Sequence, residues 1–448
     1  MFFSYPRNKR LIFIIFIIIS IGLLFIKSEL LLAQKARKAL LRHVEYLSEL
    51  GNRLAGSEGN IQAAQYISEQ MSDYELQVKK ENFHFSIYNP LSVSLRLAEE
   101  RKIGLDVISW DPFMNGNQIE GSILCVSSAT ASSAEEISKL QVSGNIVVIN
   151  PLGDKEFNLG MLNRALLLIN KNMPKAVAVV AASDQEAAKD LVGQNFTGGV
   201  IELESEQKEY NSCNIIGLLP GKSASLEEII ISAHYDSDIY PGSNDNASGV
   251  AVMLEIAKHF SSEKNKPNKS VVFCAWGAEE SGFIGSRIYV SRHSAHLKNL
   301  CQAVINIDCV GGGGEIFVEM EGGVENISPI KGSLSIPFHI VDKALHNRIL
   351  HTDILWILPQ LILASNVDES FKGTINKAVE LSGYTVMPAR YQGSDHLVFA
   401  RAGVPATNFA TSEGYTHSEE DNLTNIKVEN MEKVMNIIIK LVELLDKE

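Results

Sequence analysis

Two adjacent glutamates, Glu279 and Glu280, have the clearest capacity for chemistry in this chain. They follow an apolar run from Ser270 to Trp276 that is typical of a buried strand. Neighbouring residues in an irregular turn can point to different sides of a site, so one carboxylate can bind a metal ion while the other holds a water molecule or accepts its proton. Adjacent glutamates usually lie on the surface, but their position after a buried strand argues against that explanation here.

Other potential metal ligands follow apolar runs in the same way. His234 ends the run that begins at Ile229, and Asp308 ends the run that begins at Ala303. Because the carboxyl ends of strands in an open α/β sheet meet at one edge, we expect these side chains to lie together. Asp236 follows closely after His234, where its carboxylate can accept a hydrogen bond from the second imidazole nitrogen and fix the tautomer.

Asp245 and a second histidine complete the candidate set. Asp245 lies in the turn 242–249, where it could cap a helix, although its two carboxylate oxygens could also bridge two cations. Two zinc ions bound by oxygen donors and a single nitrogen would be unusual, so we expect another histidine. His396 opens an apparent helix and His417 follows the apolar run 406–410, and this pattern favours His417. The residues together predict a two-zinc hydrolase.

The elements that must position these residues predict an α/β fold with a mixed, mainly parallel sheet flanked by helices. Strand-like and helix-like segments alternate from residue 214 onward. Among the expected elements are strands over residues 76–88 and 270–276 and a helix over residues 428–445. Residues 90–205 contain short expected strands and no cluster of metal ligands. We therefore expect them to form an inserted smaller domain within a catalytic domain made of residues 36–89 and 206–448.

The N-terminus carries an apolar run, residues 11–26, which Arg7, Lys9 and Arg10 precede. The run has no polar face, and no clear cleavage site follows it. We therefore expect residues 1–35 to be an uncleaved signal anchor rather than a cleaved signal peptide. An anchor predicts a membrane-bound protein with an extracytoplasmic catalytic domain, whereas a cleaved peptide predicts a secreted one.

Composition argues against several other classes of protein. The 448 residues include 40 basic and 53 acidic side chains, and the resulting net charge of −13 argues against nucleic-acid binding. The chain has five cysteines and no C-x-x-C pair, which argues against a disulfide scaffold. The sequence contains neither the G-x-S-x-G motif of serine hydrolases nor the H-E-x-x-H motif of one-zinc proteases.

The ordered set of motifs resembles the co-catalytic zinc exopeptidases that include aminopeptidase Y and glutamate carboxypeptidase. The motifs that carry the resemblance are His234-Tyr-Asp236, Asn244-Asp-Asn-Ala-Ser-Gly249, Ala278-Glu-Glu-Ser-Gly282, Asn306-Ile-Asp308 and Thr416-His-Ser-Glu-Glu-Asp421. The resemblance covers about residues 36–445 outside the insert, and the insert is similar to a protease-associated domain.

This resemblance implies two Zn²⁺ ions and a peptide substrate. The zinc ligands that it implies are His234 and Asp308 for one ion, Glu280 and His417 for the other, and Asp245 for both. Glu279 would be the general base, and Asp236 would be the partner that orients His234. The resemblance also implies a cis peptide bond between Asp245 and Asn246.

The residues do not decide which end of the peptide the site would bind, although the resemblance favours an aminopeptidase. Arg390 and Arg401 lie near the last expected strands and could hold a carboxylate, as a carboxypeptidase or dipeptidase requires, but Glu413 lies there too. Many relatives have tyrosine where this chain has Thr416, so no residue is assigned to stabilise the oxyanion. Catalytically silent receptor-like relatives and one-zinc cyclases are further alternatives, and the complete ligand set disfavours both.

Overall fold

The computed structural model describes residues 31, 33–97, 101–110, 118–152, 165, 169, 174–181, 183–320, 339–340, 367–389 and 393–448. The apolar N-terminal run and Arg390 lie outside these residues. In the part of the chain that the structure describes, no helix combines the length and the hydropathy needed to cross a membrane.

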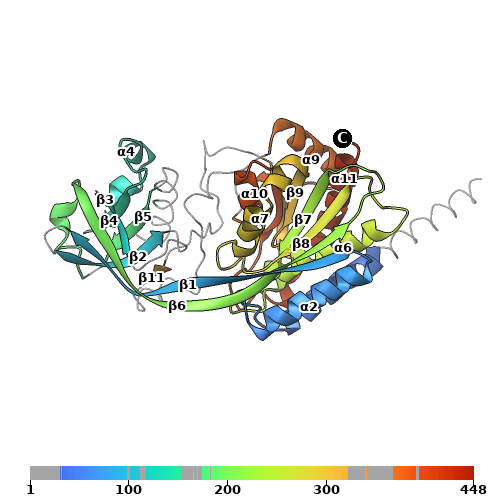
Figure 1. The fold of residues 1–448 in the computed structure, drawn as a ribbon, viewed down its shortest axis with the longest axis horizontal. Helices are drawn as coiled ribbons and strands as arrows, with labels where there is room; N and C mark the ends of the chain where they lie inside the picture. Colours follow the sequence, from blue (N-terminus) through green and yellow to red (C-terminus); the bar gives the residue numbers. More distant parts are fainter. Residues whose placement is uncertain are drawn as a thin grey trace, which may run out of the picture.

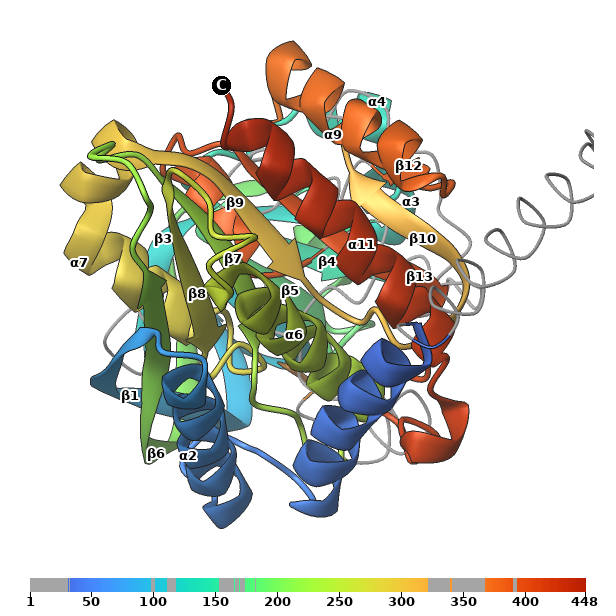
Figure 2. The same cartoon turned by 90° about the vertical axis from the view of Figure 1, so that its right-hand side faces the viewer.

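Four adjacent parallel strands carry the candidate site (Figure 2). In sheet order they are β8 (Ser270–Trp276), β7 (Glu228–His234), β9 (Cys301–Ile307) and β13 (Ala406–Glu413). On the two sides of this group, β6 (Asn195–Leu219) pairs antiparallel with β8, and β10 (Gly313–Glu319) pairs antiparallel with β13. Every residue of β7 is buried, as is usual for a strand that has parallel neighbours and helices on both faces. The mixed α/β sheet that the sequence predicts is therefore confirmed.

Helices cover both faces of this sheet (Figure 2). Ile229 and Ile231 of β7 belong to one apolar core, whereas Ile230 between them belongs to another, because successive side chains of a strand point to opposite faces. The helices of the first core are residues 33–49, α2 (Glu58–Asp73), α6 (Gly249–Ser261), α9 (Glu369–Ser382) and α11 (Val428–Leu445). Those of the second are α7 (Ile284–Leu300) and α10 (His396–Arg401).

A long antiparallel pair of strands, β1 (Gln77–Leu97) and β6, extends from this body to a second group of strands (Figure 1). The second group contains β2 (Lys102–Trp110), β3 (Gln118–Ser127), β4 (Ile146–Asn150) and β5 (Ala176–Val180). Its apolar side chains form clusters distinct from those of the catalytic sheet. The predicted boundary residues Pro90 and Ser205 are paired with each other in the long ribbon. The division into domains at these residues stays a prediction.

The shorter elements include the segment that leads into α6. Residues Ser243–Ser248 form a π-helical turn in which Asp245 and Asn246 have non-helical backbone angles. The peptide bond between these two residues is cis, as the resemblance implied. The other short elements are α3 (Ser128–Ala131), α4 (Ala134–Ser138), β11 (His339–Ile340), β12 (Met387–Ala389) and the 3₁₀ turns Lys189–Leu191 and Leu423–Asn425.

Candidate metal centre

The candidate ligands come from the carboxyl ends of adjacent strands. His234 is the last residue of β7, and Asp308 comes directly after β9. Glu279 and Glu280 lie in the turn between β8 and α7, and His417 lies in the loop after β13. Because these strands are parallel neighbours, their ends meet at one edge of the sheet, which is where ligands bind in open α/β sheets.

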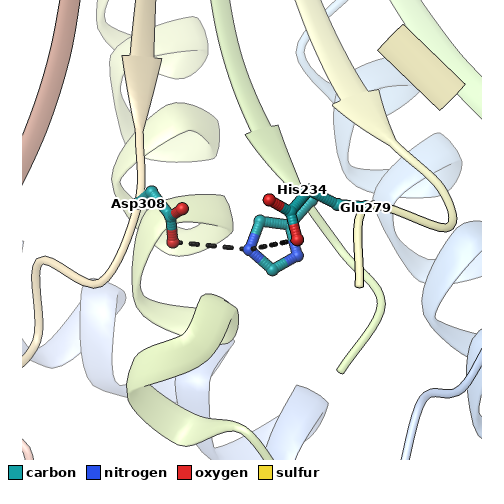
Figure 3. Close-up of side chains that lie close together, drawn as sticks. All are labelled: His234, Glu279 and Asp308. Atoms are coloured by element: carbon teal, nitrogen blue, oxygen red, sulfur yellow. Dashed lines mark hydrogen bonds and ion pairs between the residues drawn. The ribbon is translucent and has the colours of Figure 1, made fainter. Parts of the chain in front are cut away.

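His234 stands at the centre of the first group of side chains. Its Nε2 lies 3.2 Å from Asp245 Oδ1, 3.4 Å from Asp308 Oδ1 and 4.0 Å from Glu279 Oε2. Figure 3 shows the Asp308 and Glu279 carboxylates both directed at this imidazole. The ligand atoms of His234, Glu279 and Asp308 all lie within 4.8 Å of one another.

His417 stands at the centre of the second group. Its Nε2 lies 3.2 Å from Asp245 Oδ2 and 3.2 Å from Glu280 Oε2. The two oxygens of Asp245 therefore face two different histidines. One carboxylate joins the two groups, which is the arrangement that a ligand shared by two cations requires.

The spacing of these atoms suits zinc. Two donors that bind one tetrahedral zinc ion at 2.0–2.1 Å lie roughly 3.3 Å apart, close to the separations between the imidazole nitrogens and the carboxylate oxygens here. Imidazole and carboxylate are also common zinc ligands. The side chains of His234, Asp245, Asp308, Glu280 and His417 are each no more than 11% exposed. A buried, preformed set of donors of this chemistry fits a divalent cation.

The electrostatics of the cluster lead to the same conclusion. Burial alone lowers the pKa of His234, but the charges of Glu279 and Asp308 outweigh it and raise that pKa well above its usual value. Burial raises the pKa of Glu280 to about 7, although His417 opposes the shift. Without a cation, the cluster must bind protons to balance its carboxylates. A divalent cation can replace those protons.

The comparisons with known proteins identify the family. Residues 214–347 and 360–442 match peptidase family M28, and this range contains every residue of both ligand groups. Through these residues the chain belongs to peptidase family M28.

Two sequence relatives and one solved structure show how far the similarity of this M28 chain extends. Aminopeptidase YwaD of Bacillus subtilis (strain 168) is 25% identical over 437 residues, which cover 92% of this chain and 85% of YwaD. A glutamate carboxypeptidase 2 homologue of Caenorhabditis briggsae is 32% identical over 153 residues, which are 33% of this chain and 20% of that protein. The solved structure of BSAP, a zinc aminopeptidase from Bacillus subtilis, shares the fold with a TM-score of 0.52 at 21% identity, over 91% of this chain and 94% of BSAP.

Asp236 makes different contacts in the M28 chain from those that the sequence predicts. Its Oδ1 lies 3.6 Å from His234 Nδ1, which is longer than a hydrogen bond, and Nδ1 has no hydrogen-bond partner among the described residues. Its carboxylate instead accepts hydrogen bonds from the backbone amides of Glu279, at 3.0 Å, and Glu280, at 3.1 Å. The oxygens of Asp236 thus hold the turn that carries both glutamates, and its expected role in orienting the imidazole of His234 stays a prediction.

Sequence reasoning assigned no role to Asp421, although it lies in a motif of the resemblance. Its two carboxylate oxygens accept hydrogen bonds from the backbone amides of Asn244, at 2.6 Å, and Asp245, at 3.0 Å. Asp421 therefore holds the turn of Asp245 as Asp236 holds that of the glutamates. An acidic residue shortly after a candidate ligand is the available signal, but it does not distinguish a ligand from a residue that binds backbone amides.

Arg53 is a second residue that sequence reasoning missed. Its guanidinium group is fully buried and donates hydrogen bonds to the carbonyl oxygens of Leu47, Tyr235, Pro241 and Gly242. Burial lowers the pKa of Arg53 to about 10, so the side chain stays charged at neutral pH. It thereby fixes the loop between β7 and the turn of the bridging carboxylate. The glycine-rich sequence around Arg53 indicates a turn but gives no sign of these partners.

The other candidates belong to neither ligand group. His396 is fully buried, and its Nε2 lies 2.8 Å from Glu319 Oε2, so its contact is with a carboxylate outside both groups. Arg401 and Glu413, which could distinguish the two ends of a peptide, are both exposed. The geometry therefore groups His417 with the other candidate ligands, while the catalytic and ligand roles of these residues stay predictions.

Proposed function

We propose that this M28 protein is a zinc aminopeptidase that uses two zinc ions to release the N-terminal residue of a peptide. The observation that carries the proposal is the position of Asp245, whose two oxygens each lie 3.2 Å from a different imidazole nitrogen. A carboxylate so placed can bind two ions at once, and paired metal ions are an established device for hydrolysis. The names of YwaD and BSAP, both aminopeptidases, support the choice of reaction.

In this proposal each ligand group binds one ion. His234 and Asp308 hold the first, Glu280 and His417 hold the second, and Asp245 holds both. When bound, the zinc ions lower the pKa of a water molecule and polarise the scissile carbonyl group. The three ligand carboxylates would neutralise less charge than two divalent ions carry, so the ions would keep charge available to stabilise an oxyanion.

Glu279 is the side chain best placed to transfer the proton. It is buried beside the first ligand group, yet its carboxylate lies farther from His234 than the carboxylates of Asp245 and Asp308 do. In the metal-free cluster, burial raises the pKa of Glu279 well above its usual value, so this carboxylate has a high affinity for a proton. Glu279 takes a proton from the water molecule as the water oxygen bonds to the carbonyl carbon. It then gives that proton to the amine nitrogen as the carbon–nitrogen bond breaks.

Two measurements test this proposal. Metal analysis of the purified chain is expected to find about two zinc ions per chain. Hydrolysis is then compared between leucine p-nitroanilide, which has a free amine, and an N-acetylated dipeptide, which has only a free carboxylate. We expect cleavage of the nitroanilide. Cleavage of the blocked dipeptide alone would make the protein a carboxypeptidase, and zinc binding without cleavage of any peptide would make it a receptor-like relative.

A further inference from the structure

Asp421 connects two of the three segments that would supply ligands to the second ion. It lies in the loop that carries His417, and its carboxylate contacts the turn that carries Asp245. Asn244 N donates to Oδ1 at 2.6 Å, and Asp245 N donates to Oδ2 at 3.0 Å. Ser243 N also lies 3.5 Å from the main-chain oxygen of Asp421. Because both carboxylate oxygens are engaged by amides, Asp421 is poorly placed to bind a metal ion itself.

The same residue also closes the loop around His417. Asp421 N donates to the carbonyl oxygen of Ser418 at 3.0 Å, and Ser418 Oγ donates to the carbonyl oxygen of Tyr415 at 2.7 Å. His417 itself has a φ of +57°, in the left-handed region that is unfavourable for residues with a side chain. Such a conformation persists only where its surroundings hold it. The first of these hydrogen bonds closes the chain directly after His417, and the second spans His417 itself.

We propose that Asp421 is a positioning residue that sets the affinity for the ion held by Asp245, Glu280 and His417. This inference rests on the proposed two-zinc function. Of these three ligands, Asp421 holds the backbone of one and closes the loop of another. It makes none of these contacts with His234 or Asp308, the ligands that belong only to the other ion. Loss of the Asp421 carboxylate should therefore lower the affinity for the second ion more than the affinity for the first.

The substitution Asp421→Asn changes the two carboxylate contacts with little change in size, so it weakens the link between the His417 loop and the Asp245 turn while the main-chain contacts remain. The asparagine oxygen can still accept from one amide, but its NH₂ group then faces the other amide, and two donors oppose each other. Asp421 is only 2% exposed, so water cannot readily replace the lost acceptor. The turn of Asp245 must then move. Loss of a residue that supports metal ligands typically weakens metal binding 10–100-fold, and we expect a change of about this size for the second ion.

The test measures zinc binding directly. Metal-free wild-type and D421N proteins are titrated with zinc in competition with a chromophoric chelator, and leucine p-nitroanilide hydrolysis is followed against free zinc. For D421N we expect the second ion to bind about 10–100-fold more weakly. The first ion shares Asp245 but not His417, so its affinity should fall by a smaller factor. The activity curve should shift to higher zinc by the same factor, and kcat should recover when zinc saturates the site. If D421N does not fold, D421E keeps the buried charge with displaced oxygens and should show a shift in the same direction.

Asp446 provides a matched control because its carboxylate also accepts two hydrogen bonds away from the site, from Lys269 N at 2.7 Å and Asn268 Nδ2 at 2.9 Å. D446N should lose thermal stability without a shift in either zinc affinity. The inference is overturned if D421N binds both ions like the wild type, if both ions weaken equally, or if D446N shows the same zinc shift. A wild-type protein that binds fewer than two zinc ions would instead refute the proposed function.

Discussion

Replacing Glu279 by glutamine separates proton transfer from metal binding. Glutamine has nearly the same shape but cannot accept the proton of the attacking water. A general base contributes typically 10²–10⁴-fold, so we expect kcat to fall by this factor, which corresponds to about 3–5 kcal/mol of activation free energy. Glu279 Oε2 is 4.0 Å from His234 Nε2, compared with 3.2 Å for Asp245 Oδ1, so the loss of its charge should leave the zinc content close to that of the wild type.

The structure also predicts the effect of this substitution on stability. Glu279 is 6% exposed, and its raised pKa means that the charged form is costly to bury. A neutral glutamine removes that cost in the metal-free protein, so the free energy of unfolding should not decrease. The assay combines kcat for leucine p-nitroanilide, zinc content and chemical denaturation of the metal-free protein. Wild-type kcat in Glu279→Gln would refute the assignment of the base, and loss of one zinc ion would show that Glu279 is a ligand.

Three further outcomes follow from the contacts around the site. Chelation of zinc should abolish activity and lower the midpoint of thermal unfolding. An ion present at a thousandfold above its dissociation constant stabilises the folded state by about 4 kcal/mol. An unchanged midpoint would show that the ions do not stabilise the fold. Asp236→Asn should reduce kcat about 10–100-fold, because this carboxylate holds the backbone amides of Glu279 and Glu280. A wild-type kcat in steady-state kinetics would exclude a role for Asp236 in positioning the two glutamates. Arg53→Met should lower the free energy of unfolding by about 3–5 kcal/mol, because the substitution leaves buried carbonyl oxygens without their donor. Urea denaturation measures this change, and a change below about 1 kcal/mol would contradict the prediction.

The elements with regular apolar patterns could be predicted well from the sequence. The helix expected over residues 428–445 has these bounds in the structure, and so does the strand expected over 270–276. Both are largely buried, so hydrophobic side chains recur at the spacing that packing requires. The meeting of the two histidines, the two glutamates and Asp308 at one edge of the sheet was equally predictable, because each ends or follows a strand, whereas Asp245 lies in the turn before α6.

The long ribbon was much less predictable. The strand expected over residues 76–88 continues to Leu97 through Pro90, where the register with β6 shifts. Proline normally interrupts a strand, and a local irregularity allows the pairing to continue. β6 itself, Asn195–Leu219, contains a polar stretch over residues 204–211 that has none of the continuous apolar character of a central strand. Its pairing with β1 depends on contacts between distant segments rather than on a local pattern.

Within the site, residue type alone could not distinguish the carboxylates that face histidines from those that hold the backbone. Asp236 and Asp421 occupy motifs as specific as those of the candidate ligands, yet the oxygens of each accept hydrogen bonds from two consecutive amides. The oxygens of Asp245, in contrast, face two imidazoles. A carboxylate whose oxygens accept hydrogen bonds from amides has little capacity left for a cation, whereas one that faces two imidazoles can share a cation with each of them. The partners of each oxygen thus decide its role, and those partners are fixed by how the loops after β7, β8 and β13 fold against one another.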